Sequence, residues 1–327
     1  MKKAVVYGGG NIGRGFLGQI LYENGYEIVF VDVVKAMIER INQTNSYPIR
    51  IVSNECQNEI TVTGCRAVTP DGAPDEIADA DIIFTSAGVK VLPLIAPVIR
   101  EGLEKRKGKG VDIIICENLL HVDRYLSDLV KGPENVGFVE ASVGRMVPVM
   151  TPEMQDGDIA RVWVEPFCTL YVDRDGFKNP VPEIRGIVPS SPFEYHIQSK
   201  LFLHNMGHAI AAYRGLNKGY EFIWEAMEDP DIASNVKEAM YASAEALSEE
   251  FGVERSSVTA YADDLMSRFR NRYLGDTCRR VGRDPERKLA PDDRLLGAIK
   301  LCLKHGIKTD AIKKGVDAAL DHLVDLQ

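Results

Sequence analysis

KAVVYGGGNIG, residues 3–13, is the stretch that decides the fold. Its first five residues form a short β-rich run, and Gly8, Gly10 and Gly13 follow at once in the spacing G-x-G-x-x-G. Between a strand and a helix, this spacing is typical of a dinucleotide-binding turn. The first glycine permits the tight turn, the second lets the backbone approach a pyrophosphate, and the third lets helix and strand pack closely. The phosphates then lie at a helix N-terminus.

The residues after the motif complete this pattern. A second predicted strand, residues 27–31, ends in Asp32, which lies 19 positions beyond Gly13. An acid at this place accepts hydrogen bonds from the adenosine ribose hydroxyls and repels a 2′-phosphate. Because the only basic residue near Asp32 is Lys35, the sequence favours NAD over NADP. A glycine turn with a purely structural role is the disfavoured alternative.

Two further apolar runs, residues 81–86 and 111–116, are predicted as buried parallel strands. Thr85, Glu117 and Asn118 therefore fall at the carboxyl edge of the sheet, where such sheets bind ligands. The alternative role of Asn118 is to cap the helix that follows. The predicted cofactor-binding residues are Gly8, Gly10, Asn11, Ile12, Gly13, Asp32, Val33, Thr85, Glu117 and Asn118.

The chain divides into two domains by its periodicity. Residues 46–66 alternate like antiparallel strands, an insertion that a minimal nucleotide-binding fold does not need. Residues 161–172 alternate again and predict strands near the domain junction. Four prolines then fall between positions 180 and 192, and from Glu194 onward the periodicity is helical. We therefore expect an α/β fold: a Rossmann-type doubly wound sheet domain with inserted antiparallel strands at residues 1–190, followed by an all-α substrate and catalytic domain at residues 191–327.

The first long helix of the second half contains KLFLHNMGHAI, residues 200–210. At ~100° per residue, Lys200, His204, Asn205 and His208 fall within roughly 140° of one side, and the apolar residues fall on the other. A solvated helix face would carry Glu–Lys pairs, whereas this side has no acid. We therefore predict a reactive site in the cleft between the domains. A solvated Lys200 and a His208 satisfied within a core are the alternatives.

Charge and composition limit the partners. The chain has 39 Lys and Arg against 48 Asp and Glu, a net charge of -9, which opposes a role on nucleic acid or at a membrane surface. A length of 327 residues with 45% hydrophobic content suits two ordinary domains. We expect a small-molecule substrate and a monomer.

The N-terminal sequence and the cysteines indicate a cytoplasmic protein. MKKAVVYGGG runs directly into a strand and predicts no signal peptide, and no apolar run approaches the ~18 residues of a membrane span. The six cysteines form no CxxC pair, so the sequence predicts neither a disulfide framework nor a metal site.

Several motifs together resemble one family. Lys200-x4-Asn205-x2-His208 resembles the signature of the polyol-specific long-chain dehydrogenases, the mannitol dehydrogenase family. The similarity covers nearly the whole chain and is closest to the mannitol-1-phosphate 5-dehydrogenase branch. The motifs of that branch are GGGNIGRGFLG from Gly8, CENLL from Cys116, GFVEASVGRMVP from Gly137 and RVGRDPERKLAPDDRL from Arg280.

This resemblance implies an NAD-linked, zinc-independent enzyme that interconverts mannitol 1-phosphate and fructose 6-phosphate. It also implies that Lys200 is the general base, that Asn118 and Asn205 hold the reacting oxygen, that His208 orients the substrate and that Arg280 contacts it. Such a base needs a pKa near 7 to 8. The pKa of a free lysine, ~10.4, must therefore fall by about three units, which is roughly 4 kcal/mol. Burial in the cleft and the positive nicotinamide both act in that direction.

A substrate phosphate needs cationic donors. The run from Arg279 to Lys288 has five cations, and we predict Arg280 on the polyol hydroxyls and Arg283 or Arg287 on the phosphate. A solvated charge run is the alternative. Arg145 is a further predicted substrate contact, although family members usually have Asp where this chain has Gly144.

Two other functions stay open. One is a related polyol or hexuronate enzyme, of the mannitol 2-dehydrogenase, fructuronate reductase or tagaturonate reductase type. The other is a non-catalytic NAD-binding redox sensor. A sensor has no need of a base with its oxyanion donors, so Lys200, Asn205 and His208 favour an enzyme.

Overall fold

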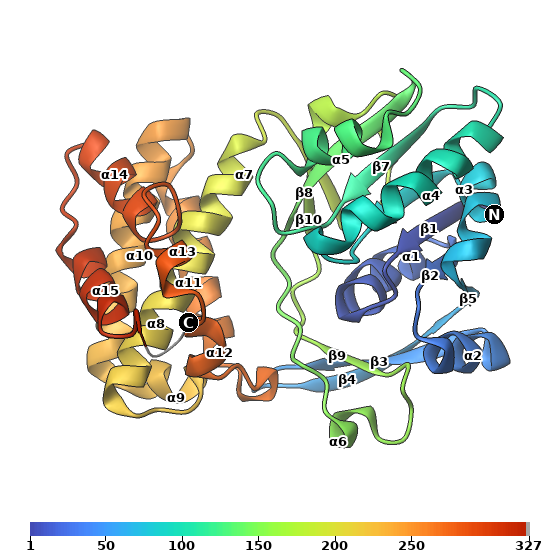
Figure 1. Ribbon diagram of the computed structural model, residues 1–327. Helices are drawn as coiled ribbons and strands as arrows, with labels where there is room; N and C mark the ends of the chain where they lie inside the picture. Colours follow the sequence, from blue (N-terminus) through green and yellow to red (C-terminus); the bar gives the residue numbers. More distant parts are fainter. Residues whose placement is uncertain (325–327) are drawn as a thin grey trace. The chain divides into compact units, whose positions relative to one another are not determined.

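The computed structural model describes residues 1–324, which divide into two compact units (Figure 1). The first unit contains residues 1–52 and 56–193. The second contains the chain from residue 194 onward together with residues 53–55. Within residues 1–324, no helix combines the length and the apolar content needed to cross a bilayer.

An eight-stranded sheet forms the first unit, in the order β11-β10-β8-β7-β6-β1-β2-β5. The six strands from β5 to β8 are parallel, β10 is antiparallel to β8, and β11 is parallel to β10 at the edge. The order of the parallel strands reverses between β1 and β6, and doubly wound sheets bind their ligands at this point. The bounds are β1 Lys3–Tyr7, β2 Glu27–Val31, β5 Cys65–Val68, β6 Ile82–Thr85, β7 Val111–Ile115, β8 Val136–Val143, β10 Leu170–Asp173 and β11 Ile187–Ser190.

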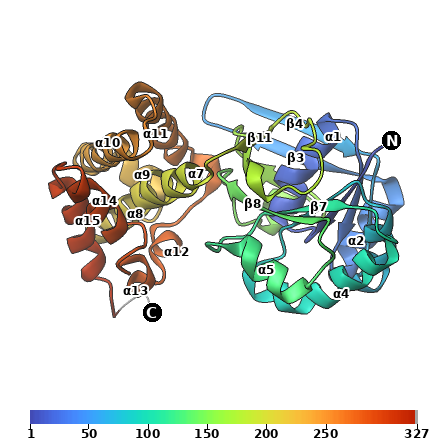
Figure 2. The same cartoon turned by 90° about the horizontal axis from the view of Figure 1, so that it is seen from above.

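Apolar side chains are buried on both faces of this sheet, as expected for parallel strands with crossover helices. In β1, Val5 belongs to one core cluster and Val6 to the other. Figure 2 shows α4 and α5 on one side and the β3–β4 hairpin on the other. The helices are η1 Gly13–Leu17, which is π-helical, α1 Gly18–Glu23, α2 Lys35–Thr44, α3 Ala73–Asp79, α4 Leu92–Lys105, α5 Val122–Val130 and α6 Pro152–Gln155.

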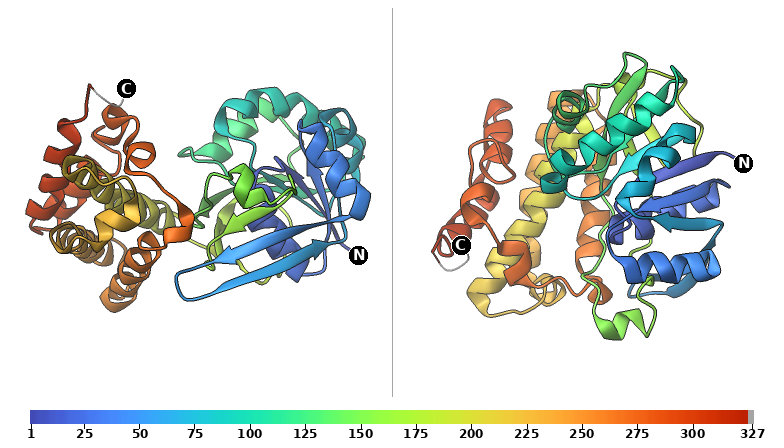
Figure 3. Two further views of the ribbon diagram at one scale, coloured as in Figure 1. Left: turned by 90° about the horizontal axis from the view of Figure 1, so that it is seen from below. Right: turned by 45° about the vertical axis from the view of Figure 1, so that its right-hand side comes forward.

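The predicted insertion is a second sheet of three strands, in the order β4-β3-β9. β3 (Ser46–Val52) and β4 (Gln57–Thr63) form an antiparallel hairpin, seen in light blue in the left view of Figure 3. β9 (Val162–Val164) pairs with β3 in parallel. The predicted strands at residues 161–172 thus separate, because β9 joins this sheet whereas β10 joins the large one.

Helices form the second unit around α8, which contacts α9, α10, α12 and α15. The approach of α15 to α8 needs a glycine, because a Cβ at Gly315 would come 2.5 Å from Ile210. The predicted fold class is confirmed: a Rossmann-like sheet with inserted strands is followed by a helical part. The helices are α7 Glu194–Ser199, η5 Lys200–Asn205, α8 Met206–Lys218, α9 Ile223–Glu228, α10 Pro230–Phe251, α11 Arg255–Phe269, α12 Cys278–Gly282, α13 Pro285–Lys288, α14 Leu296–Lys304 and α15 Asp310–Leu320.

Candidate functional site

The turn from β1 to η1, residues 8–13, is here called the glycine loop. Gly8 has φ 106°, and a Cβ added to it would come 2.5 Å from the carbonyl oxygen of Ser86, which follows β6. The Ser86 hydroxyl donates to the Gly8 carbonyl at 2.9 Å. A Cβ on Gly13 would overlap that same carbonyl. The loop can therefore close over the switch point of the sheet only with glycine at these two positions.

Gly10 lies in a different environment within the loop. A Cβ added to Gly10 would meet no atom within 4 Å, so the backbone there faces open space. Helical structure begins at Asn11 and becomes π-helical at Gly13, where the Gly18 N–H bonds to the Gly13 carbonyl, five residues earlier. Open backbone at the start of a helix fits the pyrophosphate of a dinucleotide.

Asp32 directly follows β2 and is fixed beside the glycine loop. Its Oδ1 accepts hydrogen bonds from the N–H groups of Val33 at 2.7 Å and Val34 at 2.9 Å. Its Oδ2 would be 3.3 Å from a Cβ on Gly9. Because only Oδ1 serves the backbone, Oδ2 can receive a ribose hydroxyl.

Glu117 follows β7 and supports the neighbouring loop. Its two carboxylate oxygens accept hydrogen bonds from the N–H groups of Ala87 at 2.8 Å and Gly88 at 2.9 Å. Burial raises the pKa of Glu117, and these backbone N–H groups oppose the rise. The Glu117 carboxylate thus holds the backbone of the loop that follows Thr85. Thr85 itself is fully buried.

Asn118 is exposed and does not cap a helix. α5 begins at Val122 with His121 in the N-cap position, and the Glu140 carboxylate accepts the His121 N–H at 3.1 Å. The capping alternative for Asn118 is therefore wrong, since the cap lies three residues later. Asn118 follows the last residue of β7, Ile115, by three positions, at the carboxyl end of that strand.

Arg145, predicted as a substrate contact, needs correction. The residue is 4% exposed, and its guanidinium donates to the carbonyls of Glu165, at 2.6 and 2.9 Å, and Gly15, at 2.8 Å. It also donates to Gln19 Oε1 at 2.8 Å and lies 5.8 Å from the centre of the Phe16 ring. Its donors are used inside the first unit, so Arg145 braces η1 and is not available to a substrate.

The predicted helix over residues 200–210 contains a π turn, η5. The Met206 N–H bonds to the Leu201 carbonyl, a step of five residues where an α-helix has four. The wider turn changes the predicted phases. Lys200 and Asn205, five positions apart, come onto one side of the helix, whereas an α-helix would separate them by roughly 140°. Both residues are half-buried.

His208 lies on α8 in a mostly buried setting. Its ring stacks on Phe269 with centroids 4.9 Å apart, and its Nε2 is 3.5 Å from Asp276 Oδ2. Burial lowers the pKa of His208 to about 4; Asp276 opposes this fall, and the cations Arg280, Arg294 and Lys288 reinforce it. The imidazole is therefore neutral at pH 7.

His204 lies in the core beside His208, with ring centroids 6.1 Å apart. It is 6% exposed, and burial lowers the pKa of His204 well below the usual value. These surroundings agree with a structural role for His204.

The predicted arginines differ in their surroundings. Arg280 pairs with Asp276, the carboxylate that also faces His208. Arg283 and Arg287 are exposed, and Arg287 Nη1 lies 3.6 Å from Asp293. Within the described residues, no ion pair joins either exposed arginine to Asp276.

Lys288, which no sequence motif marked as a site residue, is buried at the end of α13 with 5% of the residue exposed. Burial, reinforced by Arg294 and Arg287, lowers the pKa of Lys288 to about 8, while Asp284 and Asp293 oppose the fall. Within residues 1–324, its Nζ has no hydrogen-bond or ion-pair partner. Lys288 could not be recognised from the sequence, because it lies in a run of basic residues. Such a run predicts positive charge but does not show which of its side chains are buried.

Two other residues of the helical unit, Tyr213 and Asp276, were also missed. Tyr213 on α8 is fully buried, and its hydroxyl finds no hydrogen-bond partner in the part of the chain that is described. Asp276 had a readable signal, because an acid four residues before Arg280 can pair with it along the chain. No sequence pattern indicated that the Tyr213 hydroxyl would be buried.

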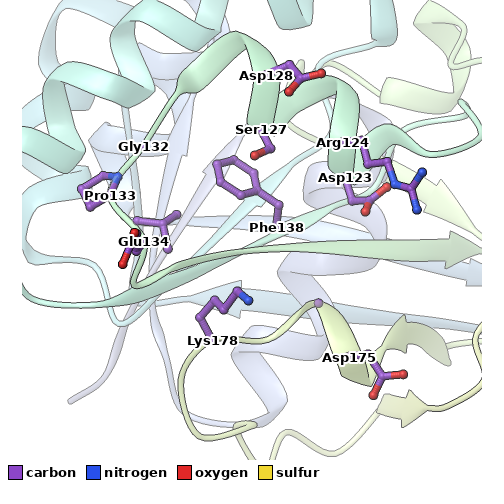
Figure 4. Close-up of a pocket in the computed structure, with 12 residues that line it drawn as sticks. Asp123, Arg124, Ser127, Asp128, Gly132, Pro133, Glu134, Phe138, Asp175 and Lys178 are labelled. Carbon is purple, nitrogen blue, oxygen red and sulfur yellow. The ribbon is translucent and has the colours of Figure 1, made fainter.

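A surface pocket of about 790 Å³ lies elsewhere in the first unit, along α5 and the start of β8 (Figure 4). Four carboxylates line it, those of Asp123, Asp128, Glu134 and Asp175, against two cations, Arg124 and Lys178. This excess of negative charge opposes the phosphates of a dinucleotide, and the pocket contains none of the predicted site residues. Within residues 1–324, no three His, Cys, Asp or Glu side chains gather as a metal site.

Comparison with known families matches both units. The model described as the mannitol dehydrogenase Rossmann domain matches residues 2–186, and the model described as the mannitol dehydrogenase C-terminal domain matches residues 192–324.

Solved structures show the same fold at low identity. D-sorbitol dehydrogenase in substrate-free form is 17% identical, with a TM-score of 0.82 over 98% of this chain and 80% of that one. Mannitol 2-dehydrogenase of Pseudomonas fluorescens, in a ternary complex with NAD and D-mannitol, is 18% identical, with a TM-score of 0.76 over 98% and 79%. Octopine dehydrogenase is 13% identical, with a TM-score of 0.54 over 100% and 92%.

Proposed function

The chain belongs to the mannitol dehydrogenase family, and from that premise we propose that it is an NAD-dependent, metal-independent oxidoreductase that interconverts mannitol 1-phosphate and fructose 6-phosphate. The single observation that carries an enzymatic role is the cluster of the helical unit. It combines Lys200 and Asn205 on one side of a π turn with a neutral His208 beside Asp276. π turns are frequent at functional sites.

NAD is the proposed cofactor. The glycine loop, with open backbone at Gly10 and the Asp32 carboxylate beside it, supports a dinucleotide without a 2′-phosphate. The relative from Pseudomonas fluorescens was solved with NAD, which agrees with this choice. When bound, NAD supplies the acceptor for the hydride that leaves the alcohol carbon.

In the proposed reaction, Lys200 accepts the proton of the substrate hydroxyl. The amides of Asn118 and Asn205 donate hydrogen bonds to that oxygen as its negative charge develops. Neutral amides suit this role because they stabilise the oxygen without giving it a proton at neutral pH. In the reverse direction Lys200 returns the proton to the reduced carbonyl.

His208 orients the substrate in this proposal. As a neutral imidazole it carries one proton, which we assign to Nε2 because that nitrogen faces the Asp276 carboxylate. Nδ1 is then the acceptor for a substrate hydroxyl. Arg280, held by the same carboxylate, is a donor to the polyol.

The substrate phosphate needs a cation, and the chain offers two kinds. Arg283 and Arg287 are exposed members of the basic run, whereas Lys288 is buried without a protein partner within residues 1–324. A desolvated cation binds a phosphate more strongly than an exposed one, which supports Lys288 beside the predicted arginines.

The experiment that tests the function is NADH oxidation by the full chain with fructose 6-phosphate, fructose, fructuronate and tagaturonate, measured side by side. We expect kcat/KM to be highest for fructose 6-phosphate. A preference for fructose would indicate a mannitol 2-dehydrogenase, and a preference for either uronate would indicate a hexuronate reductase. NADH binding without turnover of any of the four would favour the redox sensor.

A further inference from the structure

Arg14 is the first residue after the glycine loop, and its side chain is buried, with 6% of the residue exposed. Its Nη1 donates to the carbonyl of Gly9, and its Nε donates to the carbonyl of Ala160 at 3.0 Å. Gly9 belongs to the glycine loop, whereas Ala160 lies two residues before β9 of the inserted sheet. One guanidinium therefore ties the loop to the inserted sheet.

The inserted sheet also supports the backbone at Arg14. The hydroxyl of Tyr47, a fully buried residue of β3, donates to the Arg14 carbonyl at 2.7 Å. At the next residue, a Cβ on Gly15 would come 2.7 Å from Val164 of β9, so strand and π turn are in direct contact. A sheet that a minimal nucleotide-binding fold does not need thus fixes the turn that carries Arg14.

The charge of Arg14 is held by carbonyl oxygens. Among residues 1–324, no carboxylate forms an ion pair with its guanidinium, and no acceptor is found for its Nη2. Asp32 and Asp158 act on it only from a greater distance. Burial lowers the pKa of Arg14, but a guanidinium, with a usual pKa above 12, keeps its proton. Carbonyl dipoles solvate this cation without cancelling its charge.

We propose that Arg14 is a phosphate-positioning residue: its buried cation, braced against the glycine loop by the inserted sheet, stabilises the pyrophosphate of the dinucleotide. The inference rests on the proposed NAD dependence and extends it to a side chain. A positive charge behind the loop acts through little water, so its attraction for a nearby dianion is much stronger than that of a surface cation.

A purely structural Arg14 would brace the loop by its hydrogen bonds alone. The two roles differ in what they do to ligands with and without phosphate. If Arg14 only holds the loop in shape, its loss should weaken the binding of every ligand of the loop equally. If its charge matters, its loss should weaken only the binding of ligands that carry phosphate. They also differ in how they respond to a substitution that keeps the donors but removes the charge.

The test compares Arg14→Gln with Arg14→Lys in the full chain. Both variants keep hydrogen-bond donors, and only the lysine keeps a cation. Dissociation constants for ADP and for adenosine are measured by calorimetry, and the fold of each variant is checked by circular dichroism and thermal melting. We expect Arg14→Gln to bind ADP at least about tenfold more weakly and adenosine within about twofold of the original chain. We expect Arg14→Lys to keep ADP affinity within about threefold.

Three results would overturn the inference: equal loss of ADP affinity in both variants, equal loss for ADP and adenosine, or no loss in Arg14→Gln. If Arg14→Gln does not fold, Arg14→Lys still decides, because a tenfold loss of ADP affinity with the cation retained contradicts a charge effect. An original chain that binds neither NADH nor ADP would instead refute the proposed NAD dependence itself. Unchanged ADP binding in Arg14→Gln refutes only the role of Arg14.

Discussion

His208 Nε2 lies 3.5 Å from Asp276 Oδ2, and the same carboxylate pairs with Arg280. One buried acid therefore holds two residues proposed to contact the sugar. Asp276 lies outside the regular helices, in the short segment before α12. Its carbonyl accepts the Ile223 N–H at 2.9 Å, and Thr277 forms an isolated β-bridge with Phe222, so its position depends on the pairing of these two segments. We therefore expect a substitution of Asp276 to disturb both His208 and Arg280, and with them substrate binding by the helical unit.

Asp276→Asn should raise KM for fructose 6-phosphate at least ~10-fold and lower kcat less, because a neutral amide holds both partners more weakly than a carboxylate. Asp292→Asn, at an exposed acid paired with Lys300, is the matched control and should leave both constants unchanged. Steady-state kinetics checks the split. A fall in kcat with unchanged KM would remove Asp276 from substrate positioning.

The histidines of the helical unit make stability depend on pH. Burial lowers the pKa of His208 to about 4, below the value of about 6.5 in an unfolded chain. The unfolded chain therefore binds the proton first as pH falls, so the contribution of His208 is fully present above pH ~6.5 and is lost toward pH 4. Between pH 7 and 5 this residue should lower the free energy of unfolding by about 2 kcal/mol.

Urea unfolding of the original chain and of His208→Asn at pH 7 and 5 measures this effect. The variant should lose less stability over the same interval, because it lacks the titrating group. Equal losses in the two proteins would show that His208 does not titrate as its burial requires.

Lys200→Ala should lower kcat by at least ~100-fold, the usual scale of general acid–base catalysis, while the dissociation constant of NADH stays the same. Lys313→Ala, on the exposed side of α15, is the control for loss of a lysine from the same unit. Turnover kinetics and NADH fluorescence titration separate the two effects. Near-normal kcat in Lys200→Ala would exclude the residue as the base.

The fold was predictable because its signals are local. The glycine spacing and the apolar strands ending in Thr85 and Ile115 can each be read from a few neighbouring residues. The alternation in residues 46–66 likewise identified the inserted hairpin. The partner of β9 was not predictable, because strand pairing across about a hundred residues has no local signal.

The site was less predictable, for two physical reasons. The predicted directions of the side chains in residues 200–210 assumed the rotation per residue of an α-helix. The structure has a π turn there, which no sequence pattern distinguishes from an α-helix. Burial of single cations depends on tertiary packing. Arg145 seemed to be a substrate contact but braces η1, whereas Lys288 seemed to be one charge among five but is buried.

Asp32→Ala should narrow the preference for NAD over NADP, because the carboxylate that receives the ribose and repels a 2′-phosphate is gone. Glu39→Ala, at an exposed acid on α2, controls for the change of net charge near the site. The ratio of kcat/KM for the two cofactors is the measurement. Arg40 pairs with Asp158 at 2.6 Å, so we expect no arginine to capture the 2′-phosphate and no full reversal. An unchanged ratio would refute the assigned role.

The buried Lys288 and the exposed Arg283 and Arg287 are rival cations for the substrate phosphate. Lys288→Met keeps most of the buried volume and removes the charge, so KM for fructose 6-phosphate should rise at least ~10-fold while KM for fructose changes by less than ~3-fold. Arg283→Ala and Arg287→Ala, at exposed positions of the same run, should raise the first KM by less, since water screens their charges. If either arginine variant raises KM for fructose 6-phosphate, but not for fructose, more than Lys288→Met does, the phosphate is bound by that exposed arginine. Equal effects of Lys288→Met on both sugars would assign this lysine to a hydroxyl that fructose and its phosphate share.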